Sequence, residues 1–423
     1  MRRKVVAEPR TVLLSGVTGF LGRELLFELL TKTDARIVCL IRADSDHAAG
    51  RRLQGVLDKL FGPGGSRAVR GRLSTARGDV TKPMLGLDGS TRDELIATVT
   101  DVVHGAASVQ FDLPLVEARR INVGGTVHAL RFAAKAYREG QLQRFLYMST
   151  AFVGGEYPKW FCEDDLDLGQ RFRNTYERSK FEAEIFLHDS MRKVPVTIVR
   201  PSIVVGHSRS GATSAFNVIY WPLRVYADGM LRYAPATPDL PVDIVPVDFV
   251  ARGTVEALMR GEPGETYALA AGERATRASA IGDMAARVFN TEPPVFERTA
   301  LERALTPLLA PALVIGPWRR FGRAVLQYLP YFRRGSRFDT TKARALLEPS
   351  GIAPPSVDAF LEPVLEFARA TDFGRDRAAI AAEERALARQ RRRALEQRTP
   401  QRRQRRSSVH LKGVPATPAL HRA

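Results

Sequence analysis

The stretch that decides the fold is Gly16-Val17-Thr18-Gly19-Phe20-Leu21-Gly22, in which three glycines recur at intervals of three residues. It lies between an apolar run at residues 11–15 and a segment at residues 20–30 whose apolar residues recur at helical spacing. Glycines in a tight turn between a strand and a helix let the backbone approach a pyrophosphate, which the free N–H groups of the helix can bind. The stretch therefore predicts a dinucleotide site; a glycine-rich turn without a ligand is the alternative.

Segments of two periodicities alternate outward from this turn over the first 270 residues. Strand-like runs occupy residues 36–41, 72–76, 101–104, 144–148 and 194–199, and helix-like segments occupy residues 46–60, 115–137 and 175–191. Strands that alternate with helices build a parallel sheet covered on both faces. We therefore expect an α/β protein with a doubly wound parallel sheet of the Rossmann type.

The alternation weakens after Pro201, which suggests a second unit. We expect residues 1–207 to form a dinucleotide-binding Rossmann domain. Residues 208–374 are expected to form a smaller, mostly helical C-terminal substrate lobe, interleaved with late Rossmann elements at about 243–272. Residues 375–423 are interpreted as a basic tail, helical over 378–397 and disordered over 398–423, where apolar periodicity is missing.

The net charge of +18 is concentrated in this tail, which holds 14 Lys and Arg against 4 Asp and Glu, a net charge of +10. Such a charge suits contact with anionic lipid or nonspecific contact with nucleic acid. The tail lacks interleaved aromatic residues, which argues against specific nucleic-acid binding. A tail that only aids solubility is the plain alternative.

The rest of the composition is that of a globular protein, with 44% hydrophobic and 8% aromatic residues. The two cysteines, Cys39 and Cys162, show no metal-ligand spacing, so we expect no metal site and no disulfide framework. We find no signal peptide and expect a cytoplasmic protein. Residues 305–334 mix apolar residues with arginines, so a segment in peripheral contact with an anionic membrane, a lid and a buried helix pair all remain open.

The choice of cofactor is expected to depend on the end of the second strand, where Arg42 stands. An acidic residue there would bind the ribose hydroxyls of NAD, whereas an arginine accommodates the 2′-phosphate of NADP. We therefore favour NADPH, and Asp44 keeps NADH from being excluded. Farther along, Asp79, followed by Val80, is placed to reach the adenine, and the small Ala106 and Ala107 let a dinucleotide lie across the sheet edge.

Tyr176 and Lys180 are the candidate proton-transfer pair because side chains four residues apart share one face of a helix. Tyrosine is a weak acid with a pKa near 10, and a neighbouring ammonium group favours its ionised form. Ser149 and Thr150 end the preceding strand, where a hydroxyl can hydrogen-bond a substrate carbonyl.

Taken together, these motifs resemble the extended short-chain dehydrogenase/reductases over roughly residues 10–275. The resemblance rests on the ordered set Thr18-Gly19-Phe20-Leu21-Gly22, Ala106-Ala107, Asn122, Ser149-Thr150, Tyr176 with Lys180, and Arg200-Pro201-Ser202. Finer features, among them Leu40-Ile41-Arg42-Ala43, Asn122-Val123-Gly124-Gly125-Thr126 and Val245-Pro246-Val247-Asp248-Phe249-Val250, are similar to the thioester-reductase and fatty acyl-CoA reductase branch. That branch includes the terminal reductase domains of carboxylic acid reductases.

The resemblance implies a role for each matching residue. Thr150, Tyr176 and Lys180 would be catalytic, and Asn122 would help to place Lys180 through a water molecule. Arg42 and Arg52 would bind the 2′-phosphate of NADPH, and Pro201, Ser202 and Ile203 would line the nicotinamide. The remaining cofactor contacts would come from Gly16, Thr18, Gly19, Phe20, Leu21, Gly22, Asp79, Val80, Ala106 and Ala107.

The implied activity is NADPH-dependent reduction of an acyl thioester to an aldehyde, with a second hydride giving an alcohol. No adenylation or carrier domain precedes residue 10, so we expect a free acyl-CoA or a carrier protein acting in trans as the donor. A dehydrogenase or epimerase that acts on a sugar nucleotide or a sterol-like alcohol is the main alternative, although Arg42 counts against it. A non-catalytic regulator is the third hypothesis, and the intact Tyr176–Lys180 pair counts against that.

Overall fold

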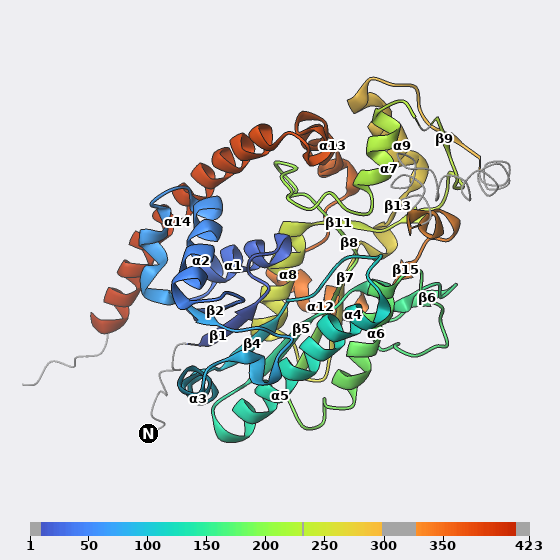
Figure 1. The fold of residues 1–423 in the computed structure, drawn as a ribbon. Helices are drawn as coiled ribbons and strands as arrows, with labels where there is room; N and C mark the ends of the chain where they lie inside the picture. Colours follow the sequence, from blue (N-terminus) through green and yellow to red (C-terminus); the bar gives the residue numbers. More distant parts are fainter. Residues whose placement is uncertain (1–9, 231, 298–326, 412–423) are drawn as a thin grey trace, which may run out of the picture.

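A seven-stranded parallel sheet forms the centre of the computed structural model, which describes residues 10–230, 232–297 and 327–411 (Figure 1). Its strands are β1 (Thr11–Ser15), β2 (Arg36–Ile41), β3 (Leu73–Arg77), β4 (Asp101–His104), β5 (Arg144–Met148), β7 (Val196–Pro201) and β12 (Thr266–Leu269). They are arranged in the order β12-β7-β5-β4-β1-β2-β3, and all neighbours run parallel. The predicted Rossmann-type sheet is confirmed.

Helices cover both faces of this sheet (Figure 1). One core contains residues of α1 (Phe20–Lys32), α2 (Asp46–Phe61) and α8 (Val247–Arg260), and the other contains residues of α3 (Gly89–Thr98), α5 (Gly124–Glu139) and α6 (Thr175–His188). Successive side chains of a strand point to opposite faces, so Val12 and Leu14 enter the first core while Leu13 enters the second. This is why the strands are apolar throughout rather than alternating.

The order of the sheet reverses between β1 and β4, since β2 follows β1 on one side and β4 lies on the other. In open α/β sheets, ligands bind outside the carboxyl ends of the strands at such a switch point. Ser15 and His104 are the last residues of these two strands and lie opposite each other in the register. The fold therefore places the candidate site at this edge.

The C-terminal part of the chain adds a third, mostly helical core. It contains residues of α7 (Tyr220–Ala227), α9 (Ala278–Phe289) and α13 (Leu361–Ala370). The lobe lies beside the carboxyl edge of the sheet (Figure 1), and β8 (Ile203–Val205), which directly follows β7, joins it to the Rossmann part. The prediction of a mostly helical lobe is confirmed.

The basic tail differs from the prediction. Helix α14 spans Arg377–Leu411 and runs along α2 (Figure 1), so the disorder predicted for residues 398–411 is wrong, while residues 412–423 lie outside the described residues. Its inner face is anchored by the buried Ala388 and Leu395 and by Arg391, which pairs with Glu24 of α1. These anchors lie in the part of the tail that was predicted to be helical, and the helix continues beyond it to Leu411.

Most of the segment considered for membrane contact, residues 305–326, lies outside the described residues. Within the described part of the chain, no helix combines the length and the apolar character needed to cross a bilayer. Peripheral contact of the basic tail with anionic lipid stays a prediction from charge.

Candidate active site

The glycine turn is packed backbone against backbone. Gly16 has a positive φ of 84°, and a Cβ on it would lie 2.6 Å from the carbonyl carbon of Gly105. A Cβ on Gly22 would lie 2.1 Å from the carbonyl oxygen of Gly16, while the N–H of Gly19 donates to that same oxygen at 3.0 Å. Gly19 caps α1 without a side-chain hydrogen bond, so the first N–H groups of the helix remain available to a phosphate. The turn thus fits a dinucleotide.

The floor beside this turn is held by Ser15 and His104, which the sequence analysis did not single out. The Ser15 hydroxyl oxygen accepts hydrogen bonds from the N–H groups of Gly105 (3.2 Å) and Ala106 (3.3 Å) and bonds His104 Nδ1 at 2.9 Å. Burial, reinforced by the charge of Lys180, lowers the pKa of His104 to about 3, so this imidazole is neutral. Ser15 therefore shapes the predicted loop of Ala106 and Ala107. A polar residue at the end of each of two neighbouring strands was the available signal.

The predicted phosphate-binding arginines meet at the rim of the site. Arg42 and Arg52 are both exposed, and the Arg52 guanidinium donates a hydrogen bond to the carbonyl of Arg42. Partial burial acts to raise the pKa of Asp79, but hydrogen bonds from Thr81 and the charges of Arg42 and Lys82 lower it overall. Asp79 therefore lies close to Arg42, as a shared cofactor site requires.

Thr150, Tyr176 and Lys180 are brought together at the carboxyl edge. The side chains of Thr150 and Tyr176 lie beside each other, and Thr150 Oγ1 donates a hydrogen bond to the carbonyl of Pro201 at 3.4 Å. Burial raises the pKa of Tyr176 to about 12, although the Thr150 hydrogen bond opposes the shift. The pKa of Tyr176 therefore shifts in the direction opposite to the lowering expected from a neighbouring ammonium group, and burial is the main cause.

Lys180 lies beneath this pair in a buried position. Its Nζ donates to the carbonyl of Met148 at 2.6 Å and stands 4.1 Å from the ring centroid of Tyr147. Burial lowers the pKa of Lys180 to about 7, and the charge of Glu184 only partly compensates. An amine with this pKa exchanges protons readily near neutrality.

Asn122 lies in a π-helical turn, Arg119–Val123, which directly precedes α5. Its amide donates to the carbonyl of Ser108 (3.1 Å) and to the hydroxyl of Ser179 (2.9 Å), and it accepts from the N–H of Ser108 (2.8 Å). Asn122 thus fastens the loop after β4 to the residue before Lys180. A water-mediated contact with Lys180 stays a prediction.

The sequence analysis did not predict a buried carboxylate that lies next to Tyr176 in the chain. Glu177 forms an ion pair with Arg173 at 3.3 Å and accepts a hydrogen bond from Tyr331 Oη at 2.7 Å. Phe111 stacks on Tyr176 with ring centroids 5.7 Å apart and on Tyr331 at 5.9 Å. The C-terminal lobe therefore reaches the start of α6. No local signal could have predicted this, because Tyr331 is 154 residues from Glu177.

Pro201 and Ile203 lie where β7 passes into β8, and buried Arg200 anchors this crossing. Arg200 binds Glu184 of α6 through two nitrogens, with a shortest distance of 2.7 Å. The residues predicted to line the nicotinamide are thereby tied to the helix that carries Tyr176.

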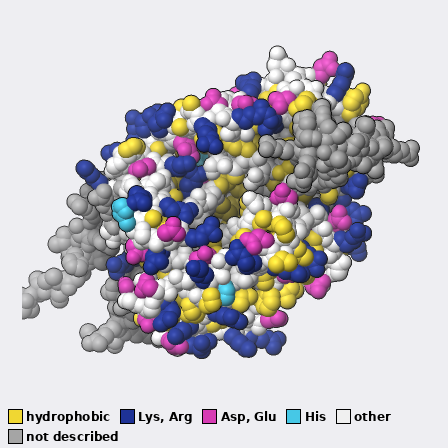
Figure 2. All heavy atoms as spheres, viewed as in Figure 1, with side chains coloured by type: hydrophobic (Ala, Val, Ile, Leu, Met, Phe, Trp, Pro, Cys, Tyr) yellow, Lys and Arg dark blue, Asp and Glu magenta, His cyan; other side chains and the backbone are white. Residues whose placement is uncertain are grey.

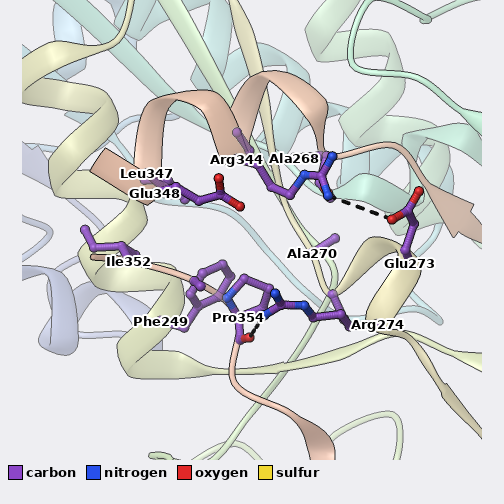
Figure 3. A pocket seen from close by; sticks show the side chains of 14 residues that line it. Phe249, Ala268, Ala270, Glu273, Arg274, Arg344, Leu347, Glu348, Ile352 and Pro354 are labelled. Atoms are coloured by element: carbon purple, nitrogen blue, oxygen red, sulfur yellow. Dashed lines mark hydrogen bonds and ion pairs between the residues drawn. The ribbon is translucent and has the colours of Figure 1, made fainter. Parts of the chain in front are cut away.

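Two cavities lie in the C-terminal half. The larger, of about 140 Å³, is apolar and has Ile203 and Tyr331 in its wall. The smaller, of about 40 Å³, lies between α12 (Thr341–Leu347) and the loop after β12 (Figure 3). Two of its arginines are already engaged, as Arg344 pairs with Glu273 and Arg274 bonds the carbonyl of Pro354. It contains none of the predicted site residues.

Neither the described side chains nor the surface suggests a metal site. Within the described ranges, no group of three or more His, Cys, Asp or Glu side chains could hold a metal ion.

On the face drawn in Figure 2, hydrophobic side chains are visible in a hollow near the middle, with Lys and Arg side chains spread around it. Such a surface suits a substrate with an apolar part and an anionic part.

Comparison with known proteins supports a dinucleotide-binding reductase. Residues 14–254, more than half of the chain, match the family model described as "Male sterility protein". The chain is 32% identical over 251 residues to the nonribosomal peptide synthetase asaC of Aspergillus flavus, covering 56% of this chain and 24% of that protein. It is 34% identical over 220 residues to a carboxylic acid reductase of Mycobacterium tuberculosis, covering 47% of this chain and 18% of that one. The chain thus spans about a quarter or less of the length of these relatives.

Among solved structures, the terminal R domain from the myxalamid biosynthetic pathway superimposes with a TM-score of 0.73 at 28% identity, covering 87% of this chain and 92% of that one. The UDP-glucuronic acid 4-epimerase of Bacillus cereus shares the fold alone. It superimposes with a TM-score of 0.58 at 18% identity, covering 85% of this chain and 99% of that one. The chain belongs to the Male sterility protein family, and it is an NAD(P)-binding oxidoreductase of the extended short-chain dehydrogenase/reductase, thioester-reductase type.

Proposed function

We propose that this chain uses NADPH to reduce an acyl thioester, presented as an acyl-CoA or on a carrier protein, to an aldehyde. The observation that carries the proposal is that Thr150 and Tyr176 lie beside each other, with the buried Lys180 one turn farther along the helix that carries Tyr176.

The choice of NADPH over NADH rests on the two exposed arginines. Arg42 and Arg52 place two guanidinium groups at the end of β2, where the 2′-phosphate is recognised in such folds. An epimerase that holds the ribose of NAD would need an acidic residue in place of Arg42. The same arginine therefore argues against the sugar-nucleotide alternative.

When bound, NADPH supplies a hydride to the carbonyl carbon, so that thioester, NADPH and one proton give aldehyde, thiol and NADP⁺. Thr150 and Tyr176 hold the carbonyl oxygen through their hydroxyl groups and stabilise the charge that develops on it. Tyr176 carries its proton at neutral pH, as any tyrosine with a pKa of 10 or above does, and we propose that it donates this proton to the oxygen. We further propose that Lys180, with its pKa of about 7, restores the proton on Tyr176.

The test is the loss of NADPH oxidation, followed at 340 nm with an acyl-CoA, in the variant Tyr176→Phe. We expect turnover to fall by at least about 100-fold, while the Kd for NADPH stays within about twofold of the wild type. Tyr137→Phe is the matched control, because Tyr137 lies on α5 with 48% of its surface exposed. Retained turnover in Tyr176→Phe would overturn the assignment.

Cofactor preference is tested separately with Arg42→Ala. The ratio of kcat/KM for NADPH to that for NADH should fall by about tenfold or more, since only NADPH carries the 2′-phosphate. An equal loss with both cofactors would show that Arg42 does not recognise the phosphate.

A further inference from the structure

The larger cavity is walled by apolar side chains from three separate parts of the lobe. Leu223 and Tyr226 come from α7, Ile281 and Ala285 from α9, and Tyr328 and Tyr331 from the segment that follows. No charged side chain lines it among the described residues. Helices α7 and α9 lie side by side in Figure 1 and share one hydrophobic core, so the wall is built by packed elements.

Among the described lining residues, the side-chain polar groups are the hydroxyls of three tyrosines, and each has a neighbouring polar partner. Tyr331 Oη donates to Glu177 and accepts from Asn174 at 2.8 Å. Tyr226 Oη donates to the carbonyl of Glu292 and accepts from Thr291. Tyr328 hydrogen-bonds the backbone of Val218. A polar ligand would lose its hydration without compensation, so the cavity suits hydrocarbon.

The cavity is connected to the predicted catalytic residues through stacked aromatic rings and through the crossing from β7 to β8. Tyr331 stands in its wall, stacks on Phe111, and through that ring reaches Tyr176. Ile203 stands in the same wall, two residues after Pro201, whose carbonyl is bonded by Thr150. A chain attached to a carbonyl at Thr150 and Tyr176 therefore has an apolar space beside it.

We propose that this cavity holds the hydrocarbon chain of the acyl thioester and limits its length to about six carbons. An apolar protein cavity of about 150 Å³ holds one benzene molecule, and this cavity measures about 140 Å³. This inference rests on the proposed function, since it names the acyl group that the same site accepts. The substrate class is a short to medium, unbranched, unsubstituted acyl thioester.

Ala278 is the residue through which the length limit can be changed. It lies at the start of α9, lines the cavity and is only partly buried, so a larger side chain there need not disrupt the core. A phenylalanine ring has the size of the ligand that such a cavity accommodates, so Ala278→Phe should fill it. Ala280 is exposed on the same helix, which makes Ala280→Phe the matched control.

The experiment measures binding and turnover of acyl-CoAs with two, four, six, eight and twelve carbons, using the whole chain with NADPH. In the wild type and in Ala280→Phe, affinity by calorimetry and kcat/KM should rise about fourfold per added methylene up to about six carbons and then level off. In Ala278→Phe this increase in affinity and in kcat/KM with chain length should disappear. The ratio of kcat/KM for hexanoyl-CoA to that for acetyl-CoA should therefore fall by at least about tenfold. Thermal unfolding shows whether each variant is folded, and Ala278→Leu replaces Ala278→Phe where it is not.

The outcomes separate this inference from the proposed function. Turnover that does not depend on chain length, or identical profiles for Ala278→Phe and Ala280→Phe, would overturn the cavity assignment and leave the reductase intact. Chain-length-dependent binding without any turnover would support the cavity and refute the reductase. Optimal binding of the twelve-carbon chain would contradict the length limit.

Discussion

Alanine at position 22 tests whether the glycine turn is held by direct backbone contact. A Cβ there would lie 2.1 Å from the carbonyl oxygen of Gly16, 2.7 Å from its carbonyl carbon and 3.0 Å from Cα of Val17. All three are backbone atoms, so the turn or the start of α1 must shift by more than an ångström to reach the 3.4 Å of ordinary contact. Overpacking of this kind costs about 1–3 kcal/mol. A loss of about 2 kcal/mol from cofactor binding corresponds to roughly 30-fold weaker affinity.

The matched control is Gly50→Ala, because a Cβ at Gly50, within α2, meets no atom within 4 Å. Replacing glycine by alanine inside a helix stabilises it by roughly 0.5–1 kcal/mol, so the control should change stability in the opposite direction. The assays are titration of NADPH fluorescence and urea unfolding of both variants. The backbone-contact argument fails if Gly22→Ala binds NADPH as tightly as Gly50→Ala and unfolds at the same urea concentration.

Two further predictions concern buried polar groups. Tyr331→Phe removes a hydrogen bond to the buried carboxylate of Glu177, so the free energy of unfolding measured with urea should fall by about 2 kcal/mol. Tyr233→Phe is the control, because Tyr233 is 48% exposed, and its free energy of unfolding should hardly change. Equal losses in the two variants would contradict a role for the buried contact. Lys180 has a folded-state pKa of about 7 against 10.5 for the free side chain, so the unfolded chain binds more protons between these values and stability rises with pH there. The wild type should therefore have a lower free energy of unfolding than Lys180→Met at pH 7, and the two values should converge towards pH 10. A difference in the free energy of unfolding that does not change with pH would refute the buried position of this amine.

The features that sequence analysis could place are local in the chain. The turn at residues 16–22 connects adjacent elements, and its glycines are required by contacts within a few residues and with one neighbouring loop. Tyr176 and Lys180 stand on one helix, so their spacing alone placed them on the same face. The β-branched and apolar runs predicted the strands because both faces of a doubly wound sheet are buried.

Other features depend on contacts between distant residues. The expectation for the pKa of Tyr176 was wrong because the depth at which its hydroxyl is buried depends on how Phe111 and the lobe pack around it. The tail was judged from its charge, whereas Arg391 is buried against Glu24, 367 residues away. Composition cannot show that a charged side chain will find a partner of opposite sign.

Periodicity and motif spacing were enough to establish an α/β dinucleotide fold, the glycine turn and the Tyr176–Lys180 pair, because each depends on residues near one another in the chain. The neutral His104 beneath the turn, the Tyr331–Glu177 contact and the apolar cavity arise only when strands and helices from distant parts of the chain meet. Side-chain burial, pKa and cavity size depend on all the surrounding elements together, and sequence spacing carries no information about them.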